Sequence, residues 1–243
     1  MDTDSGLPAS LESAWGLRER PSRGPKRALS LERIVKAGVA VADQDGLDAV
    51  SMSRVATELG TSAMSLYRYV KAKDELLTLM TDAVYADLDT ASVTGEDWRA
   101  DLSALAWRSL EALRAHAWVV RIPIAGPPLT PHQLRWMEAG LRALRGTPLD
   151  AEEKMSTMLL ISGLVRNEGT LAVDLGRLEP DPEEIMPQYK DMLLKILHPA
   201  EFPELISIVA SGMMDKDDGE DDTFQWSLER VLDGVAALIS SKE

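Results

Sequence analysis

The stretch TSAMSLYRYVKAKDEL, residues 61–76, concentrates side chains that bind nucleic acid. It holds two Tyr, one Arg and two Lys, and no acidic residue occurs between Glu58 and Asp74. Arg can donate two parallel hydrogen bonds to guanine in the major groove, while Lys and Tyr bind phosphate oxygens. These residue types favour a helix face that approaches a polyanion. The alternative is an ordinary solvated helix with two partly buried Tyr side chains.

The charge of the rest of the chain sets this basic stretch apart. The 243 residues carry a formal net charge of -14, yet residues 18–73 hold eleven Lys and Arg against six Asp and Glu. That part is therefore about +5 and the remainder about -19. Such an asymmetry is typical of a protein whose basic part contacts nucleic acid. Because the acidic remainder repels DNA, the contact must be confined to one oriented face.

Two short helices joined by a tight turn are predicted to carry these residues. In SMSRVATELG, residues 51–60, the apolar side chains fall on one helical face, and Gly60 ends the helix. Only residues 61–62 separate it from the next helix, in which Leu66 and Val70 repeat at i, i+4. Two short helices with a Gly-containing turn between them indicate a helix-turn-helix.

The remainder of the chain is also predicted to be helical. Ser30 is a suitable N-cap for a preceding helix that Gly46 ends. Every sizeable later segment has helical periodicity, and no alternating strand pattern competes with it. The segments 151–175 and 224–241 carry more apolar surface than one chain can bury, so they are predicted to form a four-helix interface between two copies. The fold class is therefore predicted to be all-α.

The composition excludes several functional classes. The chain contains no Cys, which excludes disulfides, thiol catalysis and Cys-based zinc sites, and its three His lie far apart. No run approaches the roughly 20 apolar residues of a membrane span, and the first residues do not form a signal peptide. No Gly-rich phosphate loop or nucleophile elbow is present. We therefore expect no metal, no cofactor, no membrane contact and a cytoplasmic location.

Residues 30–76 resemble the TetR/AcrR family of bacterial transcriptional regulators. The resemblance is carried by SLERIVKAGVAVADQDGLDAVSMSRVATELG (30–60) and TSAMSLYRYVKAKDELL (61–77), in which loop length, glycine position, core residues and aromatics agree. It implies a homodimeric repressor that binds a palindromic operator and is released by a small, largely apolar or aromatic effector. It also implies a three-helix helix-turn-helix domain ending at residue 76 and a larger helical ligand-binding and dimerisation domain (77–243). Residues 1–29 are rich in Ser, Pro and Gly, so they are expected to form a flexible basic extension, with a short helix candidate at LESAWGLRER (11–20).

The resemblance further implies which residues contact DNA. Ser51 and Arg54 would contact phosphates at the start of the first helix, and Ser53 lies where a base contact can occur. The following helix, 62–70, would be the recognition helix. The residues predicted to bind DNA are Ser51, Ser53, Arg54, Ser62, Ala63, Met64, Ser65, Tyr67, Arg68, Tyr69, Lys71 and Lys73.

The sequence departs from the family pattern at two recognition positions. Ala63 and Met64 are apolar where a repressor of this family can carry a polar base reader. Base reading is therefore expected to depend on Arg68 and Ser53, together with apolar contacts to thymine methyl groups.

Aromatic and Met side chains on the later helices are predicted to line an adaptable apolar pocket. Each of them alone could equally be plain core. Three polar residues, 166–168, interrupt the apolar helix 151–175; they would either orient a ligand, form an internal hydrogen-bond network or contact a second copy. The predicted lining consists of Trp107, His116, Trp118, Trp136, Met137, Met155, Met158 and Asn167.

Several alternatives stay open at the level of sequence. The basic segment 18–27 would either follow DNA into the minor groove or serve as a disordered solubilising leader. The acidic run 215–222 lacks the register of a calcium loop and is predicted to be a solvated loop. A helical enzyme and a ligand-independent DNA-binding or scaffolding protein are the competing functions. For a ligand-switched repressor, the helix that starts near Lys73 is expected to transmit the conformational change, because it joins the two domains.

Overall fold

The computed structural model describes residues 6–17, 29–124, 126–176, 182–215 and 221–243. These residues form helices and no strand, which confirms the all-α prediction. In chain order the elements are α1 (Ala9–Ala14), α2 (Leu31–Asp45), η1 (Leu47–Ala49), α3 (Met52–Glu58), α4 (Ala63–Leu66), α5 (Lys73–Val84), α6 (Trp98–Ala115), η2 (Ala117–Arg121), α7 (Pro131–Ala143), α8 (Ala151–Leu175), α9 (Pro182–Ile196), α10 (Pro203–Ala210), η3 (Met213–Asp215) and α11 (Asp222–Ser240).

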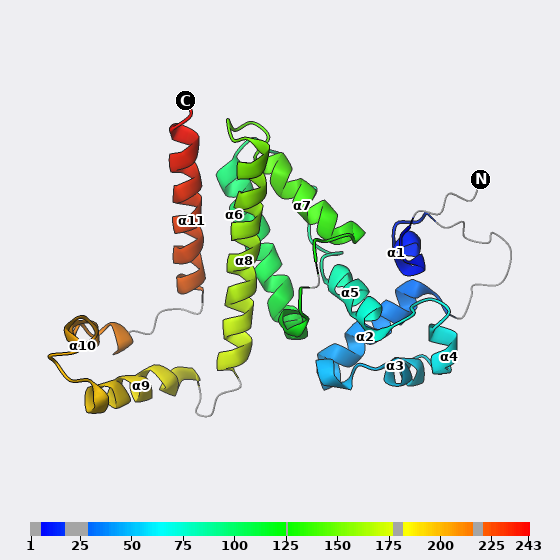
Figure 1. The fold of residues 1–243 in the computed structure, drawn as a ribbon, viewed down its shortest axis with the longest axis horizontal. Helices are drawn as coiled ribbons and strands as arrows, with labels where there is room; N and C mark the ends of the chain where they lie inside the picture. The colour runs from blue at the N-terminus through cyan, green and yellow to red at the C-terminus, as the bar shows by residue number, and fades with distance from the viewer. Residues whose placement is uncertain (1–5, 18–28, 125, 177–181, 216–220) are drawn as a thin grey trace.

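Helices α2, α3 and α4 form a small unit that packs against α5 (Figure 1). Ser30 caps α2 as predicted, since its hydroxyl accepts a hydrogen bond from the Arg33 N–H at 3.2 Å. Helices α2 and α5 approach closely at Gly38, where an added Cβ would lie 2.8 Å from the sulfur of Met80. Because α5 continues into the second part of the molecule, this close packing ties the orientation of the small unit to α5.

The larger part of the molecule is built on α6, α7, α8 and α11. Helix α6 packs against both α7 and α8, and α11 lies along α8 (Figure 1). Asp150 and Glu153 form a capping box at the start of α8. Lys242, just after α11, lies 2.7 Å from Glu153, so α8 and α11 run antiparallel. No helix of the described ranges is both long and apolar enough to cross a bilayer.

Helices α9 and α10 form an arm beside this body (Figure 1). They pack on each other and on η3 around a small cluster of Leu193, Val209 and Met214, separate from the main core. The neighbouring residues Met192 and Ile196 stay exposed, at 55% and 72%. The arm therefore has apolar surface that its own chain does not cover.

Part of the extension expected at residues 1–29 is helical, close to the helix candidate at 11–20. Residues 9–14 form α1, which packs against α2, and Ser10 and Leu11 are buried. The physical reason is that Leu11 joins the main core and the Ser10 hydroxyl donates to the carboxylate of Glu75. The basic segment 18–27 lies outside the described residues.

Candidate DNA-binding surface and ligand domain

The turn between α3 and α4 has the geometry of a helix-turn-helix. Gly60 has φ +63°, a left-handed conformation that glycine adopts without strain. The Gly60 N–H donates to the Thr57 carbonyl at 3.0 Å, and the Thr61 N–H donates to the Ala56 carbonyl at 2.9 Å. This pair of bonds is a Schellman motif, which ends α3 and redirects the chain into α4 within two residues.

The predicted recognition helix, 62–70, is helical only at Ala63–Leu66 (α4), and residues 67–69 continue it as a turn. We keep the name recognition helix for the whole segment, which presents mixed apolar and basic side chains. Leu66 and Val70 are fully buried as predicted, in the segment that packs against α3. Met64 is 74% exposed, Tyr67 is 45% exposed, and Arg68 is exposed beside them. The buried pair therefore orients these three side chains toward solvent, where a DNA groove can approach.

The two apolar residues at recognition positions, Ala63 and Met64, are placed differently. Ala63 is half-buried and packs against the main core, whereas Met64 projects outward. The small side chain at position 63 is thus explained by packing. Ser62 is the N-cap residue of α4 and Ser65 lies within that helix, with their hydroxyl oxygens 3.0 Å apart.

The residues at the start of α3 already have partners within the chain. The Ser51 hydroxyl accepts from the Arg54 N–H at 3.1 Å, so it caps α3 and keeps its own O–H to donate outward. The Arg54 guanidinium donates to Glu58 at 2.8 Å and to Asp45 at 3.0 Å. These two hydrogen bonds raise the pKa of Arg54. Ser53, between Ser51 and Arg54, is exposed.

The predicted phosphate-contact residues after α4 fall into two kinds. Lys71 and Lys73 are exposed at the start of α5. Tyr69, in contrast, is half-buried, and its hydroxyl donates to the Leu29 carbonyl at 3.1 Å. This hydrogen bond holds Tyr69 to the segment that enters α2. The exposed Lys71 and Lys73 are therefore better placed than Tyr69 to bind phosphate.

The residues predicted to line one ligand pocket lie in three separate surroundings. Trp136 and Met158 are buried, and Met137 and Trp107 pack against the same main core. The indole N–H of Trp136 donates to the Ser109 hydroxyl at 2.7 Å, and that of Trp107 donates to Gln225 at 3.0 Å. This first group therefore lies in the interior between α6, α7, α8 and α11.

The second group lies at the junction with the small N-terminal unit. His116 Nδ1 is 2.8 Å from the Asp43 carboxylate of α2, and the Trp118 indole N–H donates to the same carboxylate at 2.6 Å. Their polar atoms are thus occupied by a contact between the two parts of the molecule. The ring of Trp118 is buried against the main core.

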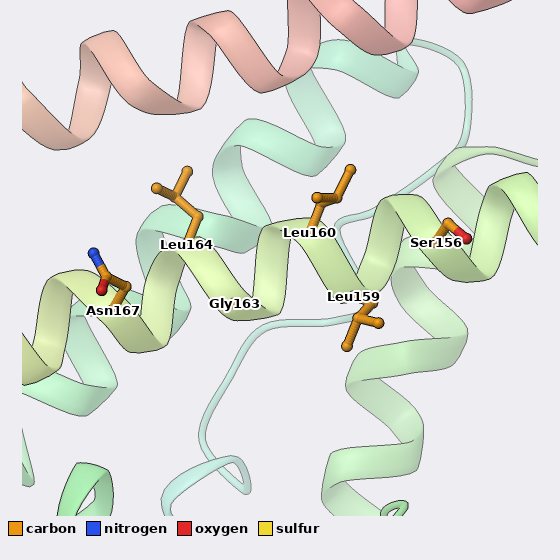
Figure 2. A pocket seen from close by; sticks show the side chains of 6 residues that line it. All are labelled: Ser156, Leu159, Leu160, Gly163, Leu164 and Asn167. Carbon is orange, nitrogen blue, oxygen red and sulfur yellow. The ribbon is translucent and has the colours of Figure 1, made fainter.

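The third group, Met155 and Asn167, is exposed on α8. Asn167 lines an open groove of about 600 Å³ along this helix, together with Ser156, Leu159, Leu160, Gly163 and Leu164. Figure 2 shows Leu160 and Leu164 pointing to the side on which α11 lies. The predicted lining therefore does not surround one cavity, and a ligand-binding role for these residues stays a prediction.

Of the polar residues 166–168, Arg166 is turned inward. Its guanidinium donates to the carbonyls of Val120 at 2.9 Å and Ile122 at 2.6 Å, so it belongs to an internal hydrogen-bond network. Burial raises the pKa of the Tyr85 hydroxyl, and the charge of Arg166 opposes that shift. The interior of this domain thus contains polar groups among its apolar side chains.

Two family models match the chain. Residues 34–80 match the model "Bacterial regulatory proteins, tetR family", and residues 92–239 match "Tetracyclin repressor-like, C-terminal domain". The chain belongs to the TetR family. It is therefore a DNA-binding transcriptional regulator of the repressor type and not an enzyme.

A curated TetR relative supports this assignment over almost the whole chain. The chain is 37% identical over 240 residues to the HTH-type transcriptional repressor DrrR1 of Streptomyces coeruleorubidus. The match covers 96% of this chain and 87% of DrrR1.

Solved TetR structures agree in fold. Apo ActR from Streptomyces coelicolor has a TM-score of 0.77 at 27% identity, covering 90% of this chain and 100% of ActR. ActR in complex with actinorhodin has a TM-score of 0.76 at 28% identity, covering 88% and 98%.

Sequence reasoning missed the side chains that join the two parts of this TetR chain. Asp43 lies in α2 and Asp82 in α5, and neither has a motif partner nearby in sequence. Asp82 is only 4% exposed. An acidic residue at the buried position of a helix was the one available signal, and a carboxylate there needs partners from another element.

Proposed function

We propose that this TetR repressor binds a palindromic operator as a homodimer and is released by a small, largely apolar or aromatic effector. The observation that carries the DNA-binding part is the recognition helix itself. Its buried Leu66 and Val70 fix the segment, and Met64, Tyr67 and Arg68 are exposed on it. In a dimer, two such helices would enter successive turns of the major groove, roughly 34–36 Å apart. A cytoplasmic location follows from this role.

The proposed dimer uses the outer faces of α8 and α11. Leu159 and Leu160 are 74% and 59% exposed, and Gly163 lies between them and Asn167 on the same groove. A glycine at this position lets a second helix approach closely. On α11, Trp226 is 64% exposed. Contiguous apolar surface of this kind is typical of an interface, and a second copy would cover it in a four-helix arrangement.

The proposed effector is suggested by the likeness to ActR, which is known in complex with actinorhodin. In this chain, Trp136, Met137 and Met158 supply aromatic and thioether surface between α6, α7 and α8. Met158 packs directly on Gly140, where an added Cβ would lie 2.2 Å from its sulfur. A flexible Met side chain can move aside for a ligand, so we place the effector next to Met158.

A ligand-independent repressor is the second candidate, and one observation favours it. Among the described residues, the α8 groove and a mixed polar hollow of about 460 Å³ beside α5 and α6 are both open to solvent. The aromatic residues predicted to line a pocket are instead packed into the core. A thermal-shift series with actinorhodin and smaller aromatic compounds separates the two. Stabilisation together with release of DNA supports the switch, and the absence of both effects supports the alternative.

The experiment that tests the DNA-binding proposal is selection of bound fragments from the host genome. Fragments retained by the full chain should share an inverted repeat and bind with nanomolar affinity at physiological salt. Binding of two chains per repeat, measured by sedimentation, is the expected stoichiometry. Retention of fragments without a common sequence would contradict the proposal.

A further inference from the structure

The N-terminus of α7 is capped by a residue from another element. Its own N-cap residue, Thr130, makes no side-chain cap hydrogen bond, and the buried Thr130 hydroxyl has no hydrogen-bond partner within the described ranges. Instead, the Asp82 carboxylate of α5 accepts from the backbone N–H groups of His132 at 2.9 Å and Gln133 at 3.0 Å. Asp82 therefore satisfies the unpaired donors and the positive dipole end of α7.

The surroundings of Asp82 make its interaction with α7 hard to replace. The residue is only 4% exposed, and its second carboxylate oxygen lies 2.7 Å from His132 Nδ1. A buried carboxylate is costly unless it is fully hydrogen-bonded. The partners described for Asp82 belong to the first turn of α7, so α5 and α7 cannot separate here without leaving a buried charge unpaired.

A second hydrogen bond reaches the same stretch from the N-terminal helix. The Trp15 indole N–H donates to the Leu129 carbonyl at 2.8 Å. Helix α1 is itself fastened to the DNA-binding side of the molecule, because Leu11 is buried in the core and Ser10 donates to Glu75 of α5. Residues 129–133 are thus held by α5 and by α1 together. In Figure 1 one end of α7 lies close to α5, in the direction of α1.

We propose that residues 129–133 couple the ligand domain to the DNA-binding domain, and that Asp82 and Trp15 are the positioning residues of this joint. The inference rests on the proposed ligand-switched repressor. From the joint, α7 continues to Trp136, whose ring packs edge-on against Tyr85 with a centroid distance of 6.3 Å. An effector that moves α7 would therefore also move α5 and the small unit of α2, α3 and α4 that packs against α5. By thermodynamic reciprocity, operator binding restrains α7.

Hydrogen exchange of the full chain, with and without an operator fragment from the genomic selection, tests the joint. In the wild type, the operator should slow exchange at residues 62–68 and also at 132–134. The Asp82→Ala variant should keep the first effect and lose the second. The Asp82→Asn variant should retain most of both, because its amide oxygen still accepts from the two N–H groups.

Asp97→Ala is the matched control. Asp97 caps α6 by accepting from the N–H groups of Arg99 at 3.1 Å and Ala100 at 3.0 Å, but within its own element. The Asp97→Ala variant should lower the stability of the chain as Asp82→Ala does. The operator should nevertheless still slow hydrogen exchange at 132–134 in this variant. If Asp82→Ala does not fold, Trp15→Phe carries the comparison, since it keeps an aromatic ring and removes only the N–H donor.

The outcomes distinguish the two levels of the proposal. The proposed coupling through residues 129–133 is contradicted if the operator still slows exchange at 132–134 in both Asp82→Ala and Trp15→Phe. It is also contradicted if this slowing disappears equally in Asp97→Ala. Either result leaves the DNA-binding proposal intact. No slowing at 62–68 in the wild type contradicts the proposed function itself, and the joint falls with it.

Discussion

The exposed residues of the recognition helix differ in what they can read. Arg68 has the planar donors that match guanine, whereas Met64 offers only apolar surface, suited to thymine methyl groups. Lys71 and Lys73 are point charges at the start of α5 and can bind phosphate without regard to sequence. Arg54 is already held by Glu58 and Asp45, so its phosphate contact would require exchange of those acids.

Replacing Arg68 with Ala should weaken operator binding by roughly 1–3 kcal/mol if it reads guanine, and relax the preference at one base pair of each half-site. Fluorescence anisotropy against the selected operator and single-base variants measures both effects. The fold should be unaffected, since Arg68 is exposed. Equal affinity of wild type and variant would show that Arg68 does not read a base.

Replacing Lys73 with Ala should act differently, by weakening specific and non-specific DNA binding alike. Removal of one lysine–phosphate interaction per chain reduces the number of counterions released on binding. The slope of log K against log salt should therefore become less steep by about 0.9 for each phosphate that is no longer neutralised. A titration series between low and moderate salt measures the slope, and a weakening confined to the operator would contradict the phosphate role.

At the scale of elements, two glycines and two interactions between distant elements decide how the helices meet. Gly38 lets α2 lie close to Met80 of α5, and Gly60 forms the turn into the recognition helix. The α7 cap from Asp82 and the hydrogen bonds that His116 and Trp118 make with Asp43 then join the two parts of the chain. The recognition helix itself is short, so its position depends on these neighbours.

The turn gives a prediction about stability. Gly60→Ala should destabilise the chain by roughly 1–2 kcal/mol, because a Cβ is strained at φ +63° although no atom lies within 4 Å of it. Urea unfolding measures the decrease. Gly146→Ala is the control, since Gly146 also has open space around it and lies outside the left-handed region. Equal stability of both variants would show that the turn carries no strain.

At the scale of the whole molecule, the uncovered apolar surface is the dominant feature. Exposed large apolar side chains lie along α8, at Trp226 on α11, and on α9 and α10 of the arm. A net charge of -14 keeps such chains apart at long range, so a second copy must be held by close apolar packing.

Leu159→Asp should therefore convert the proposed dimer to a monomer and weaken operator binding, because a monomer engages only one half-site at a time. Sedimentation equilibrium measures the first effect and anisotropy the second. The control is Ile124→Asp, a residue with the same 74% exposure in the loop before α7. If both variants stay dimeric, or both dissociate, the α8 groove is not the specific interface.

The sequence alone determined the parts of this protein that depend on local spacing. Helical periodicity, the Ser30 cap, the glycine at position 60 and the buried pair Leu66 and Val70 are all local, so the helix-turn-helix and the all-α fold were predictable. The resemblance at residues 30–76 was likewise confirmed as membership of the TetR family.

Only the tertiary structure decided which distant side chains meet. It placed His116 and Trp118 against Asp43 instead of beside Trp136, ordered α1 on the core, and gave α7 a cap from α5. None of these interactions has a sequence signature, because each joins residues at least 50 positions apart whose meeting depends on how whole helices pack. The identity of the helices is thus a property of short segments, and the joint between the domains is a property of the folded chain.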